Sequence, residues 1–225
     1  MSATVAVVTP AFRAERWIAA CVRSVLAQTH AEWEHWIVAD DGGDYERLLA
    51  EAGIRDARLR FLASGAVGGG ASRARNLALE RIGAPYVAIL DADDRFKPDK
   101  LARAVEALSH HAIVSVALEE FDESGRRLRL VGAGPDGPLR PGDYKWTCLS
   151  MDSMLVWDRR RTDARYDVEL TNMTDLELLL QLYRTATESF HLGTPLHDYL
   201  KLSVSMSNGP GVTEKMIRSK RELLR

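Results

Sequence analysis

Cysteine is scarce in this sequence, which has 225 residues and only two cysteines, Cys21 and Cys148. Two thiols are too few for a disulfide framework, so the sequence excludes the class of small disulfide-stabilised domains. Cys21 falls on the apolar face of a helix expected at 15–28, which favours a buried free thiol. A free thiol suits a reducing compartment, and we therefore expect a cytoplasmic protein.

Long apolar runs and a strong net charge are missing too. No stretch approaches the roughly 20 apolar residues of a membrane span, and the N-terminal sequence lacks the basic segment of a signal peptide. A formal net charge of -2 produces no overall field that would recruit nucleic acid. We therefore expect no transmembrane segment and no nucleic-acid partner.

The C-terminal tail is the basic exception. TEKMIRSKRELLR (213–225) fits a solvated surface helix, and it also fits a peripheral contact with the inner face of a membrane or with a partner. The sequence leaves these alternatives open, and it leaves open a homodimer as well.

Strands and helices alternate through the first 110 residues. Apolar, β-branched runs are each followed by a segment with helical spacing, which predicts an α/β fold with a mostly parallel, Rossmann-like sheet and helices on both faces. Gly83 is placed to cap the third helix. The strands are expected at 4–9, 35–39, 58–62 and 86–90, and the helices at 15–28, 44–52, 71–82 and from 98 onwards.

The second half, 111–225, has a different pattern and predicts a small antiparallel region in the same compact domain. A Gly/Pro-rich loop at 132–143 has the length and composition of a functional lid or a disordered segment. Thr171 or Thr174 would cap the helix in this half. The strands are expected at 112–118, 127–131, 153–157 and 198–205, and the helix at 175–186.

The sequence ILDADD (89–94) places three carboxylates after a buried strand. Asp91 and Asp93 point the same way in an extended backbone, whereas Asp94 faces away and starts the turn toward Pro98. Carboxylate oxygens at this spacing suit Mg²⁺ or Mn²⁺, with water or substrate phosphate completing the coordination. The alternative is a solvated acidic turn that caps the following helix.

Two further polar loops follow strands or precede a helix. GGGASRARN (68–76) could cradle a phosphate, with Arg73 or Arg75 beside it, or its arginines could lie on the surface. Asp40 and Asp41 could bind a second metal, contact a base or sugar, or form a turn. Three polar loops come at the carboxyl ends of strands: TP (9–10), DDGG (40–43) and DADD (91–94). Because ligands of such sheets bind at the carboxyl ends of the strands, we expect these three loops to converge on one crevice.

The roles of several isolated residues in the second half can each be interpreted in two ways. His197 is either a metal or phosphate ligand or a structural histidine. Tyr144, Trp146 and Trp157 could stack on a sugar ring or pack in the core.

Several motifs occur in a fixed order between residues 4 and 185: VVTPAF, SVLAQT, IVADDG, ARN, YVAILDADD followed by KPDKL, and TDLELLLQL. In this order the sequence resembles glycosyltransferase family 2. The resemblance implies a GT-A fold, with residues 1–110 as the nucleotide-sugar-binding half and 111–225 as the acceptor-binding half.

The resemblance also implies the donor site. Thr9, Pro10 and Phe12 would line the nucleotide pocket. Asp40 or Asp41 would contact the base or ribose, and Arg73 or Arg75, with Asn76, would border the diphosphate. Asp91-Ala92-Asp93 would be the DXD motif, in which Asp93 binds the metal directly and Asp91 lies nearer the ribose.

Asp175 matches the aspartate of the family's Glu-Asp pair and would be the catalytic base. Thr174 stands where the glutamate is expected. Because Asp175 starts a helix, the helix dipole is expected to lower its pKa and keep it ionised.

The implied function is metal-dependent, inverting transfer of a sugar. Mn²⁺ or Mg²⁺ would be the cofactor and a UDP-sugar the donor, with a glycan, a lipid-linked molecule or a small molecule as acceptor. One alternative is a sugar nucleotidyltransferase, although the sequence lacks a Gly-rich, basic loop directly after the first strand. The other is a nucleotide-binding module that has lost catalysis.

Overall fold

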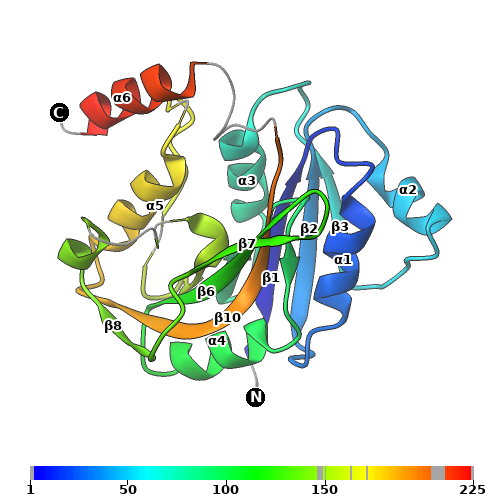
Figure 1. Cartoon of the computed structure of the whole chain (residues 1–225). Helices are drawn as coiled ribbons and strands as arrows, with labels where there is room; N and C mark the ends of the chain where they lie inside the picture. The colour runs from blue at the N-terminus through cyan, green and yellow to red at the C-terminus, as the bar shows by residue number, and fades with distance from the viewer. Residues whose placement is uncertain are drawn as a thin grey trace.

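A central sheet with helices on both faces forms the protein (Figure 1). The computed structural model describes residues 3–145, 149, 151–162, 164–170, 172–203 and 211–223. The strands of the sheet follow the order β3 (Leu59–Ala63), β2 (Trp33–Ala39), β1 (Val5–Ala11), β4 (Tyr86–Ile89), β9 (Leu155–Asp158), β6 (Ile113–Asp122), β10 (Ser189–Lys201) and β5 (Arg95–Phe96), while β7 (Arg127–Val131) pairs with β6 and β8 (Gly137–Leu139) with β10.

The helices divide between the two faces of the sheet. Val5 and Val7 of β1 pack in one apolar cluster with α1, α2 and α4, and Ala6 and Val8 pack in another with α3 and α5. This alternation explains why the sequence of β1 is apolar throughout. The helices are α1 (Ile18–Leu26), α2 (Tyr45–Glu51), α3 (Ala71–Leu79), α4 (Lys100–Leu108), α5 (Thr174–Leu182) and α6 (Val212–Leu223), with short 3₁₀ turns η1 (Pro141–Lys145) and η2 (Asp152–Met154).

The first half of the sheet is parallel, as predicted. β1 lies between β2 and β4 and is parallel to both, and β3 continues the parallel arrangement beyond β2. The carboxyl ends of these strands therefore lie at the same edge of the sheet. This edge is where the sequence places its polar loops.

The second half is only partly antiparallel. β9 runs antiparallel between β4 and β6, and β7, β8 and β5 are antiparallel to their neighbours. β10, however, runs parallel to β6. Strands from both halves of the chain thus belong to one continuous sheet.

β10 is longer than the sequence predicts, since it begins at Ser189 rather than at residue 198. Its first part contains Gly193 and Pro195, which are unfavourable within strands. The structure accommodates them by shifts in register around Pro195. Pairing with β6 therefore overrides the local preference.

The Gly/Pro-rich loop is ordered and tethered, so the prediction of a disordered segment is wrong. The alternative, a functional lid, stays a prediction. The loop contributes β8 and η1. The carboxylate of Asp136 accepts a hydrogen bond from the backbone N–H of Gly193 (2.8 Å) and pairs with Arg103 (3.1 Å). Gly132 O lies 2.7 Å from His191 Nε2. These contacts fix the loop against β10 and α4.

Two predicted helix caps are also wrong. α3 ends at Leu79 with Glu80 as its C-cap, so Gly83 lies beyond the helix. α5 begins at Thr174, and Met173 takes the N-cap position with a left-handed φ of 60°. The other candidate cap, Thr171, lies outside the described residues, as does Cys148.

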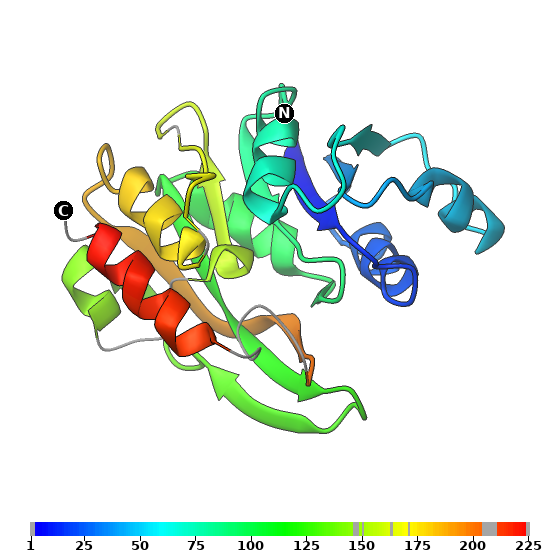
Figure 2. The ribbon, with the colours of Figure 1, turned by 90° about the horizontal axis from the view of Figure 1, so that it is seen from above.

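The C-terminal helix α6 lies on the side of the molecule that carries α5 (Figure 1 and Figure 2). Within the described part of the chain, every helix is too short or too polar to cross a membrane.

The expected buried thiol is confirmed. Cys21 belongs to α1 and is fully buried in the apolar cluster that this helix forms with β1, α2 and α4.

Candidate active site

The loops after β1 and β2 meet the glycine-rich loop where these two strands end. The carboxylate of Asp40 accepts hydrogen bonds from the backbone N–H groups of Gly69 (3.1 Å) and Gly70 (2.8 Å). Asp40 N donates to Ala11 O (2.8 Å), and Gly68 N donates to Asp40 O (2.7 Å). Asp40 therefore holds the glycine-rich loop against the ends of both strands, which is a structural use of a residue expected to contact the base or ribose.

Asp41 is also committed to its own loop. Its carboxylate accepts hydrogen bonds from the N–H of Arg13 (2.5 Å), the N–H of Gly43 (2.9 Å) and the hydroxyl of Tyr45 (2.7 Å). Burial opposes ionisation of Asp41, but these bonds outweigh it and lower its pKa. Asp41 is thus an ionised anchor between the loop after β1 and the start of α2.

The residues expected to line the nucleotide pocket differ in exposure. Thr9 is fully buried, and its hydroxyl lies 2.8 Å from His35 Nε2 and 3.9 Å from Cys21 Sγ. The expectation that the side chain of Thr9 lines the pocket is therefore wrong. Burial lowers the pKa of His35 to about 3 and raises that of Cys21. Pro10 is half-buried, whereas Phe12 is 45% exposed and presents a large apolar face.

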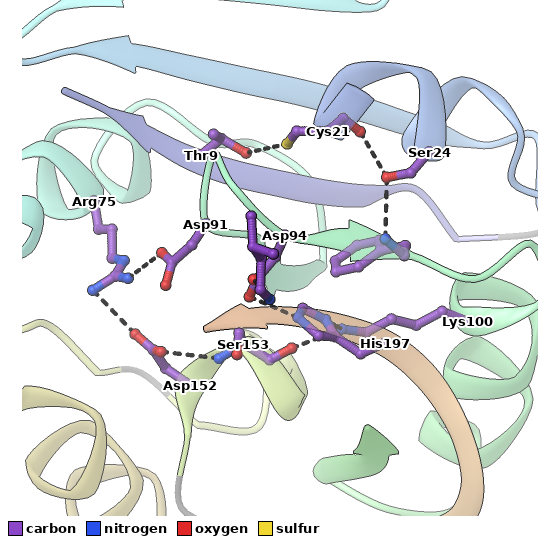
Figure 3. Close-up of polar contacts among 12 residues, drawn as sticks. Thr9, Cys21, Ser24, Arg75, Asp91, Asp94, Lys100, Asp152, Ser153 and His197 are labelled. Carbon is purple, nitrogen blue, oxygen red and sulfur yellow. Dashed lines mark hydrogen bonds and ion pairs between the residues drawn. The ribbon is translucent and has the colours of Figure 1, made fainter. Parts of the chain in front are cut away.

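The acidic turn after β4 uses its three carboxylates in different ways, and Figure 3 shows the contacts of two of them, Asp91 and Asp94. Asp91 Oδ1 accepts a hydrogen bond from Arg75 Nη2 at 2.5 Å. Asp93 is half-buried, and burial together with the charge of Asp91 raises its pKa to about 6. Asp94 is 1% exposed, and its Oδ2 lies 2.8 Å from His197 Nε2. The side chain of Asp94 therefore points into the protein interior, which agrees with the prediction that it faces away from Asp91 and Asp93. The alternative of a solvated acidic turn is wrong for this residue.

Arg75 and Asn76 are both bound within the protein. The Arg75 guanidinium lies between Asp91 and Asp152, with Nη1 3.2 Å from Asp152 Oδ2, and 5.1 Å from the ring centroid of Tyr166. Burial opposes its charge, but the two carboxylates raise its pKa. The Asn76 amide donates to Tyr166 O (2.8 Å) and accepts from Tyr166 N (2.9 Å). Both side chains therefore hold the walls of the site.

Arg73 lies on the exposed side of α3, whereas Arg75 is buried. The Arg73 side chain is exposed and lies against the glycine-rich loop, where a Cβ on Gly69 would be 3.3 Å from Arg73 Cδ. Among the described residues, no acidic group pairs with it. Of the two arginines on α3, Arg73 is the one whose side chain is exposed and available to an incoming phosphate.

A buried polar chain extends behind the acidic turn. Lys100 is fully buried, and its Nζ donates to Ser153 O (2.7 Å) and lies 3.1 Å from His197 Nδ1. Its ammonium also lies 3.7 Å from the ring centroid of Phe96. Burial lowers the pKa of Lys100 and of His197. Both ring nitrogens of His197 contact protein groups. His197 is therefore a structural histidine rather than a metal or phosphate ligand.

Asp175 lies at the start of α5, as predicted, and its Oδ1 accepts a hydrogen bond from Leu176 N (2.8 Å). Burial, followed by the charge of Asp152, raises its pKa to about 6. The expected lowering by the helix dipole is therefore wrong, because burial and the neighbouring carboxylate outweigh it. Asp175 titrates close to neutral pH, which suits a general base.

Sequence reasoning missed the residues that link these groups. Asp152, Tyr166 and Lys100 are buried and contact residues distant in the sequence. Asp152 lies in MDSM, which carries no motif, and its partner Arg75 is far away in the chain. A weak signal existed for Lys100, since a lysine in an otherwise apolar helical stripe is unusual inside a core.

The aromatic residues of the second half belong mainly to the core. Trp157 is 1% exposed within the apolar cluster that includes α3 and α5. Tyr144 is half-buried, its hydroxyl lies 2.9 Å from Ser189 Oγ, and its ring meets Tyr183 edge-on. Trp146 lies outside the described residues. Of the two interpretations, core packing is therefore the correct one for Trp157.

The donor set at the acidic turn fits a divalent cation that also binds substrate. Within the described ranges, no group of three His, Cys, Asp or Glu side chains could enclose a metal on its own. Asp93 is close enough to Asp91 for the charges to interact, and no cationic side chain of the described residues pairs with it. A half-buried carboxylate without a cationic partner fits a hard cation whose other ligands are phosphate and water.

The family is decided by comparison with known sequences. A model of glycosyltransferase family 2 matches residues 6–172. The chain belongs to glycosyltransferase family 2. Residues 1–349 of TarS from S. aureus, solved in complex with UDP-GlcNAc, superpose on this family 2 chain with a TM-score of 0.79 at 18% identity, covering 99% of this chain and 67% of TarS 1–349. The fold is therefore the GT-A fold expected from the resemblance.

Two relatives illustrate how far the similarity reaches. TuaG of Bacillus subtilis (strain 168), a glycosyltransferase assigned to teichuronic acid biosynthesis, is 29% identical over 91% of this chain and 81% of its own length. WfgD of Escherichia coli, a UDP-Glc:alpha-D-GlcNAc-diphosphoundecaprenol beta-1,3-glucosyltransferase, is 34% identical over 46% of this chain. The family 2 chain spans only 40% of WfgD.

Proposed function

We propose that this family 2 protein is a metal-dependent, inverting glycosyltransferase that moves a sugar from a UDP-sugar to an acceptor hydroxyl. The observation that carries the proposal is the half-buried Asp93 carboxylate, which lies beside Asp91 and has no cationic partner among the described residues. Two of the similar proteins support the choice of donor, since TarS is solved with UDP-GlcNAc and WfgD is named for UDP-Glc.

Asp91 and Asp93 would hold Mn²⁺ or Mg²⁺. Such an ion, when bound, neutralises the charge on the leaving diphosphate. Arg73, exposed beside the glycine-rich loop, would contact the same diphosphate. Phe12, with its exposed ring, offers an apolar face to the base.

Asp175 is the base in this proposal. Leu176 N–H occupies Oδ1, so Oδ2 is the oxygen that would accept the proton of the acceptor hydroxyl. The hydroxyl oxygen then forms the new bond to C1 of the sugar as the bond from C1 to the diphosphate breaks. A single displacement of this kind inverts the anomeric centre. A base with a pKa of about 6 is ionised at pH 7 and still accepts a proton readily.

The acceptor is proposed by class. TuaG is assigned to teichuronic acid biosynthesis, and WfgD is named for a diphosphoundecaprenol-linked sugar. A glycan or lipid-linked sugar is the corresponding acceptor for this chain. The basic helix α6 would then suit a peripheral position at the cytoplasmic face of a membrane.

The test measures UDP release from UDP-glucose and UDP-GlcNAc with Mn²⁺. We expect turnover by the wild-type protein, with a loss of at least about a hundredfold in Asp93→Ala and in Asp175→Asn. Asp99→Ala is the matched control, because Asp99 is exposed and lies outside the site. Full activity of Asp93→Ala would refute the metal assignment, and UDP binding without turnover would indicate a nucleotide-binding module instead.

A further inference from the structure

The acidic turn closes a ring of polar contacts (Figure 3). Each member is joined to the next by a hydrogen bond, an ion pair or the peptide chain, and the ring begins and ends within the Asp91–Asp94 segment. Its members are, in order, Asp91, Arg75, Asp152, Ser153, Lys100, His197 and Asp94.

One arm of the ring holds Asp91. Arg75 Nη2 donates to Asp91 Oδ1 (2.5 Å), and Arg75 Nη1 lies 3.2 Å from Asp152 Oδ2. The same Asp152 oxygen accepts a hydrogen bond from the Tyr166 hydroxyl (2.7 Å), and Asp152 Oδ1 accepts from Ser153 N (2.9 Å). Asp91 is thereby fixed to η2 through Arg75.

The other arm holds Asp94. Lys100 Nζ donates to Ser153 O (2.7 Å) and lies 3.1 Å from His197 Nδ1. His197 Nε2 lies 2.8 Å from Asp94 Oδ2, and Asp94 Oδ1 accepts a hydrogen bond from Leu200 N (2.8 Å). Asp94 is thereby fixed to the same short turn, η2, and to β10.

The Asp94 arm is costly as a purely structural device. Lys100, His197 and Asp94 are each at most 1% exposed. Well-packed apolar side chains usually replace a buried ion pair without loss of stability.

The two arms leave one carboxylate of the turn uncommitted. Asp94 N also donates to Asp91 O (3.0 Å), which fixes the backbone between the two anchored aspartates. Asp93 lies between them, half-buried and without a cationic partner among the residues the structure describes. The backbone on both sides of Asp93 is thus fixed by the contacts of Asp91 and Asp94.

We propose that His197, Lys100 and Asp94 are positioning residues that aim the Asp93 carboxylate at the divalent cation of the donor diphosphate. This inference rests on the proposed function. Groups that orient a metal ligand typically change metal affinity by about 10- to 100-fold when they are removed. The arm would therefore affect metal binding through Asp93, although its own three members are buried.

The test compares His197→Leu with His197→Gln. Leucine removes both contacts, whereas the glutamine amide oxygen can accept from Lys100 and its amide nitrogen can donate to Asp94. Mn²⁺ binding is measured in the presence of UDP from the loss of the free Mn²⁺ signal in electron paramagnetic resonance, and thermal unfolding is followed by circular dichroism. We expect Mn²⁺ affinity about tenfold or more weaker in His197→Leu and within about threefold of wild type in His197→Gln.

A second variant covers the case in which His197→Leu does not fold. Asp94→Asn with Lys100→Met removes both charged groups together, so no unpaired charge is buried. We expect the same loss of Mn²⁺ affinity in this folded double variant. If either variant folds and still binds Mn²⁺ with wild-type affinity, the positioning role is overturned. A wild-type protein that binds no Mn²⁺ with UDP would instead overturn the proposed function itself.

Discussion

Asp175 shows at the scale of one residue how burial shapes a catalytic group. Burial and the charge of Asp152 raise its pKa from 3.8 to about 6. The carboxylate is then ionised at neutral pH but holds a proton far better than an exposed aspartate. The same shift has a cost, because an ionised carboxylate at this place is less stable than it would be in water.

We expect the pH dependence of kcat/KM to report this pKa. The measurement is made at saturating Mn²⁺, because burial and Asp91 raise the pKa of the metal ligand Asp93 to about 6 as well and a bound cation keeps it ionised. Since the base must be deprotonated, kcat/KM should then fall about tenfold per pH unit below about 6. Asp152→Asn should move this acidic limb to lower pH, because it removes one of the negative charges that raise the pKa. The measurement is UDP release over pH 4.5 to 8. An unmoved limb in Asp152→Asn would exclude coupling between the two carboxylates.

Stability should respond to the same carboxylate in the opposite sense to activity. The folded protein binds the Asp175 proton more tightly than the unfolded chain does, so the free energy of unfolding decreases as pH rises from about 4 to about 6. Asp175→Asn should therefore raise the free energy of unfolding at pH 7 by on the order of 1 to 3 kcal/mol. Urea unfolding at pH 7 and at pH 4 checks this, and the gain should shrink at pH 4.

The contact between the Gly/Pro-rich loop and β10 illustrates the scale of whole elements. A Cβ on Gly193 would overlap the carbonyl oxygen of Gly134, whereas a Cβ on Gly134 would meet nothing within 4 Å. Gly193 also donates its N–H to Asp136 (2.8 Å). The loop is therefore held by a close backbone approach that requires glycine at one position.

We expect Gly193→Ala to destabilise the protein by roughly 1–3 kcal/mol, because the loop must shift away from β10. In a chain of this size each kcal/mol lowers the melting temperature by about 2–4 °C. Gly134→Ala is the matched control and should leave the melting temperature nearly unchanged. Equal effects of the two substitutions would show that the loop moves freely.

The elements also differ in how well local sequence predicts them. β1, with its continuous apolar run, and α1, with its apolar rows, appear close to where the sequence places them. β10 was missed over its first half because Gly193 and Pro195 disfavour a strand locally. Pairing with β6 supplies the stabilisation that a local pattern does not contain.

At the scale of the whole molecule, donor binding should stabilise the folded chain. The site is assembled from loops after β1, β2 and β4 together with η2 and α5, so a ligand bound there bridges both halves of the sheet. A ligand that binds only the folded state, at a hundredfold excess over its Kd, adds about 2.7 kcal/mol to the free energy of unfolding.

We therefore expect UDP-sugars with Mn²⁺ to raise the melting temperature more than GDP- or dTDP-sugars do. Thermal shift measurements with and without Mn²⁺ rank the donors directly. Asp93→Ala is the matched protein control and should lose the Mn²⁺-dependent part of the shift. A larger shift with a GDP- or dTDP-sugar would refute UDP as the donor nucleotide.

The sequence by itself determined the parallel first half of the sheet, the polar loops at the ends of its strands and the place of Asp91, Asp93 and Asp175. These features follow from patterns within short stretches: apolar periodicity, turn residues and motif order. The tertiary structure alone decided which side chain each carboxylate of the site contacts. Arg75 is committed to Asp91 and Asp152, and Asp94 turns inward to His197. Such pairings join residues far apart in the chain, and burial sets both their energies and their pKa values.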